Sequence, residues 1–311
     1  MKKMSSTKVV LVTGAAGFIG CHCVLNLLEN DYEVVALDNC SNSVLINGQK
    51  LPESLRRVEV LAKKSLKEFI FADLTKESSV DNVFRKYRFD AVIHLSSLKS
   101  ITESISEALH YYSNNIKATL NLLDSMKKFQ VFQLIFGSSA SVYGKPKYLP
   151  IDESHPTGHS LTSPYAKSVF MIEQILQDLC ASDPKWTVVS LRIFNTTGAH
   201  SSGDIGEDPP TVPKNLMPYL TQVAIGRRAE LRVYGSDYDT RDGTGVRDFV
   251  HIEDVCDAIL KVLNKMLSEE WVHWYVFNVG SGSGHTVLEV CFCVKYRSFV
   301  AIFLFEGYLN V

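Results

Sequence analysis

Residues 8–20 constrain the fold of this chain more than any other stretch, and they read KVVLVTGAAGFIG. Four consecutive apolar residues, Val9 to Val12, are typical of a strand buried on both faces. An apolar helix opens at Phe18-Ile19, and three glycines mark the turn at a spacing of three: Gly14, Gly17 and Gly20. Such a turn lets backbone N–H groups and the helix dipole approach a pyrophosphate. The spacing alone leaves two interpretations open, a dinucleotide site and a glycine turn without a ligand.

A second apolar run, Glu33 to Leu37, ends at Asp38. A carboxylate at the tip of the second strand accepts hydrogen bonds from an adenosine ribose and repels a 2′-phosphate. No arginine follows directly in residues 39–43, which read NCSNS. The strand–glycine–helix context favours a ribose partner over an aspartate that only caps a turn. The sequence therefore predicts NAD rather than NADP as the cofactor.

Composition excludes several classes of protein. The length of 311 residues fits one large domain or two modest ones. A net charge of −2 gives no reason to expect nucleic acid or a membrane surface as partner. Seven cysteines without a Cys-x2-Cys pair indicate reduced thiols and no zinc site. The apolar runs are too short for a signal peptide or a membrane span, so we expect a soluble, cytoplasmic protein without a metal.

Strand and helix patterns alternate over the first two-thirds of the chain, which predicts an α/β fold with a Rossmann-type doubly wound parallel sheet. Expected strands cover residues 9–12, 33–37, 68–71, 91–95, 133–136 and 187–194, and expected helices cover 51–64, 76–87, 106–128 and 164–179.

The pattern changes after Asn195, because residues 196–213 are rich in Gly, Pro, Ser and Asp. Short helices are then expected at 216–225 and 252–267, mixed with short strands at 231–234 and 276–279. We predict an NAD-binding domain, a smaller and incomplete C-terminal α/β substrate domain packed over the sheet edge, and a divergent tail: residues 1–195, 196–290 and 291–311.

Two side chains stand where open α/β sheets place their ligands: Ser139 follows the fifth expected strand, and Tyr165 lies at the start of the next helix. A tyrosine near a hydroxyl and a nicotinamide exchanges a proton with a substrate alcohol while hydride goes to the cofactor. Free tyrosine has a pKa of about 10, so such a site needs positive charge close to the ring. His94 lies inside the fourth expected strand and is expected to be a packed core residue rather than a catalyst.

These features occur beside a series of longer motifs, and together they resemble the extended short-chain dehydrogenase/reductases, specifically the UDP-glucose (UDP-galactose) 4-epimerase family. The resemblance covers roughly Lys8 to Val290, and the motifs of the second domain are more specific than the glycine turn. It rests on VTGAAGFIG (12–20), LPESLRR (51–57), SSASVYG (138–144), HPTG (155–158), GAH (198–200), GEDP (206–209), NLMPY (215–219) and DGTGVRD (242–248).

The resemblance implies an NAD-dependent interconversion of UDP-galactose and UDP-glucose. Tyr165 would take the proton from the sugar 4-hydroxyl while the C4 hydride passes to NAD, the 4-keto sugar would turn over, and the hydride would return to its other face. Ser139 would hydrogen-bond the reacting oxygen. The implied cofactor residues are Gly14, Gly17, Phe18, Ile19, Gly20, Asp38, Asn39, Asn42, Asp73, Leu74, Lys99 and Asn115. The implied UDP-sugar residues are Ser139, Asn195, Asn215, Leu216, Val233, Tyr234 and Arg247.

The chain departs from the family at the reacting tyrosine. The family has a lysine four residues after it, whereas here position 169 is Val169. Position +4 of a helix lies about 40° round from the tyrosine, and Lys167 lies about 160° away, so Lys167 cannot easily substitute. After Val290 the chain stops resembling the family, and we expect a chain truncated or diverged from that point.

These departures keep a second interpretation open, a catalytically disabled relative that binds NAD and UDP-sugars. A 4,6-dehydratase of the same superfamily would need an acid pair after the serine, which Ala140-Ser141 do not supply. An interaction protein without a ligand would have no use for Asp38, Asn195 and Arg247 together. By analogy alone, the expected long helices at 106–128 and 164–179 form a candidate homodimer interface.

Overall fold

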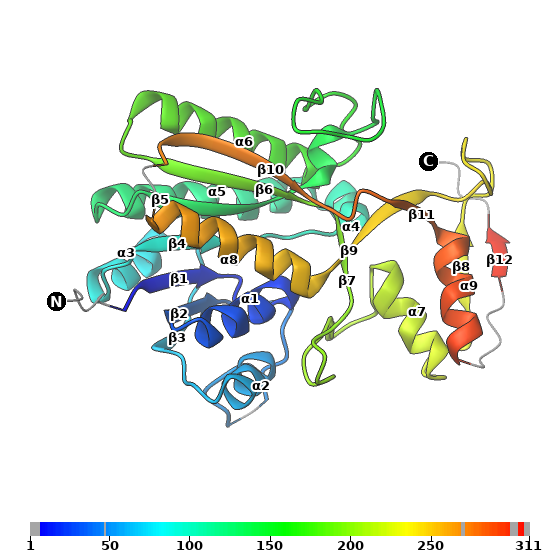
Figure 1. Ribbon diagram of the computed structural model, residues 1–311, viewed down its shortest axis with the longest axis horizontal. Helices are drawn as coiled ribbons and strands as arrows, with labels where there is room; N and C mark the ends of the chain where they lie inside the picture. Colours follow the sequence, from blue (N-terminus) through cyan, green and yellow to red (C-terminus); the bar gives the residue numbers. More distant parts are fainter. Residues whose placement is uncertain (1–6, 47, 269–270, 299–303, 308–311) are drawn as a thin grey trace.

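A seven-stranded parallel sheet forms the centre of the molecule, in the order β10-β6-β5-β4-β1-β2-β3 (Figure 1). The computed structural model describes residues 7–46, 48–268, 271–298 and 304–307. This sheet confirms the predicted α/β, Rossmann-type fold class. Its strands are β1 (Val9–Thr13), β2 (Glu33–Asp38), β3 (Glu68–Phe71), β4 (Ala91–His94), β5 (Gln133–Ser139), β6 (Thr187–Ile193) and β10 (His273–Val279).

Side-chain alternation along β1 shows why these strands are continuously apolar. Val10 and Val12 pack into one hydrophobic cluster and Leu11 into another, and all three are fully buried. Because successive side chains of a strand point to opposite faces, each face of the sheet must be covered by helices. The chain order reverses between β1 and β4, so a ligand crevice is expected beyond the carboxyl ends of these strands.

Helices cover both faces of the sheet (Figure 1). Side chains of α1, α2 and α8 belong to one cluster, and those of α3, α5 and α6 belong to the other. A short helix, α4, which the sequence did not predict, precedes α5. The bounds are α1 (Phe18–Glu29), α2 (Glu53–Ala62), α3 (Glu77–Lys86), α4 (Ile101–Ser106), α5 (Ala108–Lys128), α6 (Pro164–Ser182) and α8 (Ile252–Ser268), with a 3-10 turn, η1, at Ala140–Tyr143.

Two elements beyond residue 195 return to the central sheet. Strand β10 pairs in parallel with β6, from His273 opposite Thr187 to Val279 opposite Ile193. Helix α8 packs beside α1 in the same hydrophobic cluster. The segment predicted as a second domain therefore contributes both an edge strand and a covering helix to the first. The domain boundary at residue 195 stays a prediction.

A smaller lobe lies beside the carboxyl edge of the sheet, at the right of Figure 1. It contains α7 (Leu216–Ala224), β8 (Leu231–Tyr234), α9 (Val287–Ser298) and β12 (Leu304–Gly307), with β12 paired in parallel to β8. A three-stranded sheet of β7 (Asn195–Thr197), β9 (Val246–His251) and β11 (Gly284–Thr286) leads into it. The lobe has its own apolar cluster, which includes Leu220, Val233 and Cys291. The expected tail therefore begins inside α9, and its residues 299–303 and 308–311 lie outside the described part of the chain.

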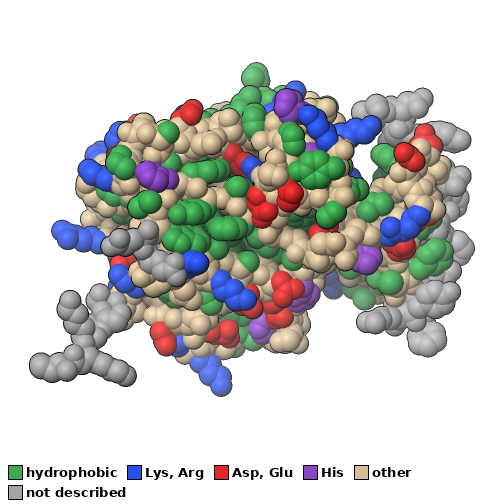
Figure 2. All heavy atoms as spheres, turned by 45° about the horizontal axis from the view of Figure 1, so that its top comes forward, with side chains coloured by type: hydrophobic (Ala, Val, Ile, Leu, Met, Phe, Trp, Pro, Cys, Tyr) green, Lys and Arg blue, Asp and Glu red, His purple; other side chains and the backbone are tan. Residues whose placement is uncertain are grey.

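Among the described residues, we find no helix that is both long enough and apolar enough to cross a membrane. On the face shown in Figure 2, the described Lys and Arg side chains are spread over the surface and do not gather into one basic patch. This distribution agrees with the small net charge of −2.

Candidate functional site

The glycine turn between β1 and α1 can be formed only by glycines at two of its positions. Gly14 has φ of +69°, and a Cβ atom there would lie 2.8 Å from the backbone of Leu95. A Cβ atom at Gly20 would lie 2.0 Å from the Gly14 carbonyl oxygen. Helix α1 starts directly after Gly17, and within the described chain no side chain caps its first N–H groups. Those donors therefore remain free for a pyrophosphate, which is the cradle that NAD requires.

Asp38 lies beside this turn at the end of β2. Its two carboxylate oxygens accept hydrogen bonds from the backbone N–H of Ala16 at 2.9 Å and of Cys40 at 2.7 Å. Burial raises the pKa of Asp38, and these backbone donors oppose that rise. Each carboxylate oxygen has a second lone pair, so Asp38 retains acceptor capacity for a ribose hydroxyl. Of the other residues predicted there, Asn39 is exposed and accepts from the Ser41 N–H at 3.1 Å, and Asn42 is exposed in the same loop.

Asp73 and Leu74 follow β3 at the same edge of the sheet. The Asp73 carboxylate accepts from the backbone N–H and the hydroxyl of Thr75, at 2.9 and 2.8 Å. Leu74 is buried, and its carbonyl accepts from the Asn121 side chain at 2.8 Å. The structure thus places both residues next to the Asp38 strand end, while their contact with a cofactor stays a prediction.

Asn115 connects the loop after β4 to helix α6. Its side chain accepts from the Leu98 N–H at 2.9 Å and donates to the Leu98 carbonyl at 3.0 Å. It also donates to the Ser168 hydroxyl at 3.1 Å. Asn115 is 1% exposed, so its effect is to fix the loop that carries Lys99 relative to the helix that carries Tyr165. The structure therefore gives this predicted cofactor residue a clear positioning contact.

Ser139 and Tyr165 meet at the carboxyl end of β5. Helix α6 begins at Pro164, and the Ser163 side chain caps it by accepting from the Ala166 N–H at 3.2 Å. This start places Tyr165 in the first turn, where its phenol lies close enough to the Ser139 hydroxyl for that side chain to lower its pKa. Burial raises the pKa of Tyr165, and the Ser139 side chain opposes that rise. The two predicted catalytic residues are brought together.

Among the described residues, burial and Ser139 account for the shift in the pKa of Tyr165, and no neighbouring cation contributes to it. Val169, one turn further along α6, is 3% exposed and packs in the hydrophobic cluster that Tyr165 borders. Lys167 is exposed. Ser168 points inward instead, and its hydroxyl donates to the Tyr165 carbonyl at 2.7 Å.

A buried polar network near Ser139 and Tyr165 was not predicted from the sequence. Arg192 on β6 forms a two-point ion pair with Glu173 on α6, at 2.8 and 3.1 Å, and the Ser138 hydroxyl donates to Glu173 at 2.5 Å. Arg192 also donates to the Tyr143 hydroxyl at 2.9 Å. The available signal was a charged residue inside the apolar strand TVVSLRI, because a buried charge requires a partner.

Ser141 is a second residue that the prediction missed. Its backbone N–H donates to the Ser139 hydroxyl at 3.2 Å, which helps to orient that side chain. The Ser141 hydroxyl is itself buried and has no hydrogen-bond partner among the described residues. Buried hydroxyls are nearly always paired, so this one is a candidate contact for a bound substrate.

The predicted UDP-sugar residues lie on the lobe side of the site. Asn195 is on β7 and Arg247 on the adjacent β9, both exposed, and the Arg247 guanidinium donates to the Val246 carbonyl at 2.7 Å. Asn215 precedes Leu216 at the start of α7. Val233 packs in the lobe core and Tyr234 is exposed, so these two neighbours on β8 face opposite ways. Their contact with a nucleotide sugar stays a prediction.

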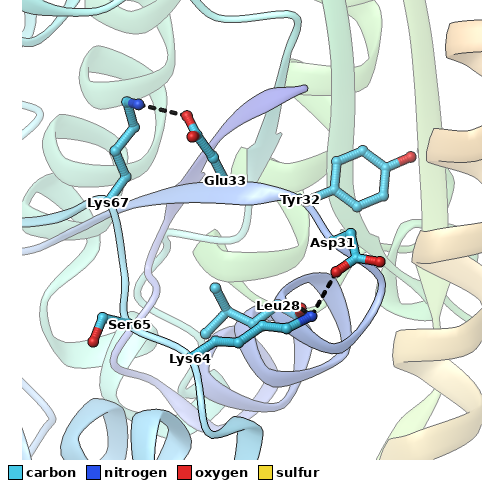
Figure 3. Close-up of a pocket in the computed structure, with 7 residues that line it drawn as sticks. All are labelled: Leu28, Asp31, Tyr32, Glu33, Lys64, Ser65 and Lys67. Atoms are coloured by element: carbon cyan, nitrogen blue, oxygen red, sulfur yellow. Dashed lines mark hydrogen bonds and ion pairs between the residues drawn. The ribbon is translucent and has the colours of Figure 1, made fainter. Parts of the chain in front are cut away.

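A hollow of about 360 Å³ lies at the opposite, amino end of the sheet (Figure 3). The Lys64 ammonium in it pairs with Asp31 at 2.7 Å, and Lys67 pairs with Glu33. Since each lysine already has a carboxylate partner, the hollow has no spare positive charge for an anionic ligand. No group of three or more His, Cys, Asp or Glu side chains within the described ranges is placed to hold a metal ion.

The sheet, the glycine turn with its strand-end aspartate, and the serine–tyrosine pair define a dinucleotide-binding protein of the short-chain dehydrogenase/reductase type. Comparison with known proteins supports this class of protein. The model of the "NAD dependent epimerase/dehydratase family" matches residues 10–280. The chain belongs to this family, which confirms the resemblance found in the sequence and the NAD cofactor.

Individual members of the family show a more specific similarity, to UDP-glucose 4-epimerases. The chain is 50% identical over 281 residues to the UDP-glucose 4-epimerase of Homo sapiens, covering 90% of this chain and 79% of that protein. The enzyme of the same name from Bacillus subtilis is 46% identical over 281 residues, with the same coverage. A solved structure of UDP-glucose 4-epimerase from Bifidobacterium longum, in complex with NAD+ and UDP, superposes with a TM-score of 0.91 at 43% identity, over 96% of this chain and 86% of the other.

Proposed function

We propose that this protein binds NAD and a UDP-hexose and interconverts UDP-galactose and UDP-glucose by inverting C4. The observation that carries the proposal is the proximity of the Tyr165 phenol to the Ser139 hydroxyl at the carboxyl edge of the sheet. It lies in a chain similar to UDP-glucose 4-epimerases, one of which was solved with NAD+ and UDP.

The residues present fit NAD. The free N–H groups after Gly17 suit the pyrophosphate, and Asp38 suits the adenosine ribose without its 2′-phosphate. Loop residue Lys99, fixed through Asn115, supplies a cation on the same edge of the sheet. When bound, NAD supplies a reversible hydride acceptor.

The chain's own residues then handle the proton. Tyr165 accepts the proton of the sugar 4-hydroxyl and later returns it, while the neighbouring Ser139 hydroxyl hydrogen-bonds the reacting oxygen. Arg247 supplies a planar charged fork suited to a diphosphate. Asn195, Asn215 and Leu216 complete the nucleotide-sugar surface of the proposal.

We further propose that turnover is slow. Tyrosine must lose its proton to act as a base, but burial raises the pKa of Tyr165, and position 169 offers a buried valine in place of an ammonium. Each pKa unit by which the tyrosine pKa is not lowered corresponds to about 1.4 kcal/mol in the free-energy difference between its phenol and phenolate forms. Loss of a general-base arrangement lowers turnover by about 10²-fold or more.

Conversion of UDP-galactose to UDP-glucose by the purified chain tests this proposal beside two variants. Val169→Lys places an ammonium one helical turn from Tyr165 and should raise turnover by about 10²-fold. Val169→Met is the matched control, because it adds comparable length without charge. Equal turnover in the unaltered chain and Val169→Lys would contradict the account.

The buried valine at position 169 also supports a second candidate function, that of a relative that binds NAD and UDP-sugars without turnover. It predicts bound NAD and UDP in the unaltered chain with no conversion in any variant at position 169. Activity in Val169→Lys would exclude it. The homodimer expected through α5 and α6 also stays a proposal; exposed apolar side chains on these helices, including Leu109, Leu120 and Met171, are available for it.

A further inference from the structure

Two ion pairs of opposite orientation join the loop after β4 and the following helix α4 to the segment before α7. The Lys99 ammonium lies 3.1 Å from Glu207, and the Lys214 ammonium lies 3.0 Å from Glu103. Each side of this contact therefore contributes one cation and one carboxylate. In Figure 1, α4, which carries Glu103, lies on the side of the main sheet that faces the small lobe.

Both carboxylates are oriented by further partners. The Glu207 oxygen that pairs with Lys99 also accepts from the Asn215 side chain at 2.7 Å. Glu103 accepts from the Tyr111 hydroxyl at 2.8 Å, and that hydroxyl accepts from the Ser100 N–H at 3.1 Å. Pre-oriented carboxylates lose less side-chain freedom on pairing than isolated surface ones. Nearby Lys214 and the Tyr111 hydroxyl lower the pKa of Glu103, which agrees with this geometry.

The joined segments carry residues of both predicted ligand sites. Lys99 belongs to the predicted cofactor set, and Asn215, which shares Glu207 with it, belongs to the predicted sugar set. An ammonium has three donors, so Lys99 can hold Glu207 and still donate to a cofactor oxygen. The Glu207 side chain is only 15% exposed, and it contacts one residue of each predicted set, Lys99 and Asn215.

We propose that Glu207 and Lys214 are positioning residues for nucleotide-sugar binding. The two ion pairs hold residues 207–215, and with them the start of α7, against helix α4 and the loop that carries Lys99. The proposal rests on the proposed function. Breaking either pair frees the segment that carries Asn215 and Leu216, so UDP binds less tightly. Because three of the four charged side chains are about half exposed, the expected loss is about two- to fivefold for each pair.

A charge swap at the Glu103–Lys214 pair provides the test without altering any predicted ligand residue. Glu103→Lys and Lys214→Glu each bring like charges together, and the double variant restores an opposite pair. Two quantities are measured on the full chain loaded with NAD: amide hydrogen exchange in residues 207–216, and UDP affinity by calorimetry. The single variants should speed exchange and weaken UDP binding about fivefold, and the double variant should recover both.

Glu207→Gln tests the other pair, with Asp208→Asn as the control, because Asp208 is an exposed neighbour and the charge change is the same. Glu207→Gln should weaken UDP binding, whereas Asp208→Asn should not. Single charge reversals that leave exchange or UDP affinity unchanged, or a double variant without recovery, would overturn the proposal. Absence of UDP binding in the unaltered chain would refute the proposed function, and hydrogen exchange would still decide whether the ion pairs hold the segment.

Discussion

Glu173→Gln is the perturbation that most directly tests how the serine–tyrosine pair is supported. Glu173 on α6 and Arg192 on β6 have side chains that are 1% and 7% exposed, and two hydrogen bonds join them. The Ser138 hydroxyl, adjacent to Ser139 on β5, donates to the same carboxylate. Glu173 thus links the helix that carries Tyr165 to the strand that carries Ser139.

The magnitude follows from the charge that the variant leaves behind. Removing one partner of a buried ion pair typically costs about 3–5 kcal/mol, because the other charge remains buried without compensation. Glutamine keeps one acceptor oxygen, and Arg192 retains its bond to the Tyr143 hydroxyl at 2.9 Å. We therefore expect a loss of about 3 kcal/mol in the free energy of unfolding, which a domain with about 5–15 kcal/mol of stability survives. The turnover of the folded variant should fall as well.

Urea denaturation of the unaltered chain and of three variants checks this reasoning. The control is Asp178→Asn, an exposed carboxylate on the same helix, which should change stability by no more than about 0.5 kcal/mol. The double variant Glu173→Gln with Arg192→Met removes both charges and should be more stable than Glu173→Gln alone. If the double variant is no more stable than the single one, an uncompensated buried charge is not the cause.

Two further predictions concern the sheet and the glycine turn. His94 bonds Thr13 at 2.7 Å and Thr119 at 3.0 Å, and burial lowers its pKa from 6.5 to about 4. His94 therefore binds a proton more readily in the unfolded chain than in the folded one, so the free energy of unfolding should fall as the pH falls from 6.5 to 4. The unaltered chain should lose about 3 kcal/mol more over this range than the His94→Gln variant does. Gly20→Ala should destabilise the fold by about 1–3 kcal/mol and prevent NAD binding, since its Cβ would lie 2.0 Å from the Gly14 carbonyl oxygen. Gly17→Ala, with the corresponding contact at 3.3 Å, should cost less stability; equal losses on thermal unfolding would contradict this steric account.

Local patterns in the sequence predicted most of the central fold because each element there is decided by its own residues. The third strand was predicted at the residues where β3 is found, and His94 is a packed core residue as expected. Strand β5 is longer than predicted, because residues Gly137 to Ser139 pair with β6 although their composition resembles a loop. Strand pairing, rather than local composition, decides such an end.

The second part of the chain shows where local patterns fail. Only residues 276–279 of β10 were predicted as a strand, and its place at the edge of the main sheet depends on pairing with β6, more than eighty residues earlier in the chain. Strands β7 and β9 were missed because they are short and partly exposed, without a clear alternation. The Glu173–Arg192 and Lys99–Glu207 pairs join distant segments, and no sequence pattern specifies which acid meets which base.

The two ends of the candidate site depend on different parts of the chain, and this bears on how it can change. The cofactor end is built largely from backbone: free N–H groups after Gly17, close approaches at Gly14 and Gly20, and peptide donors that hold Asp38. Such a site tolerates substitution at most surrounding positions. Under the proposed function, the reacting end depends on single side chains, and the valine at position 169, which packs well in the core, supplies no charge for a tyrosine base. Binding can therefore persist where turnover does not, and affinity for NAD measured beside turnover separates the two.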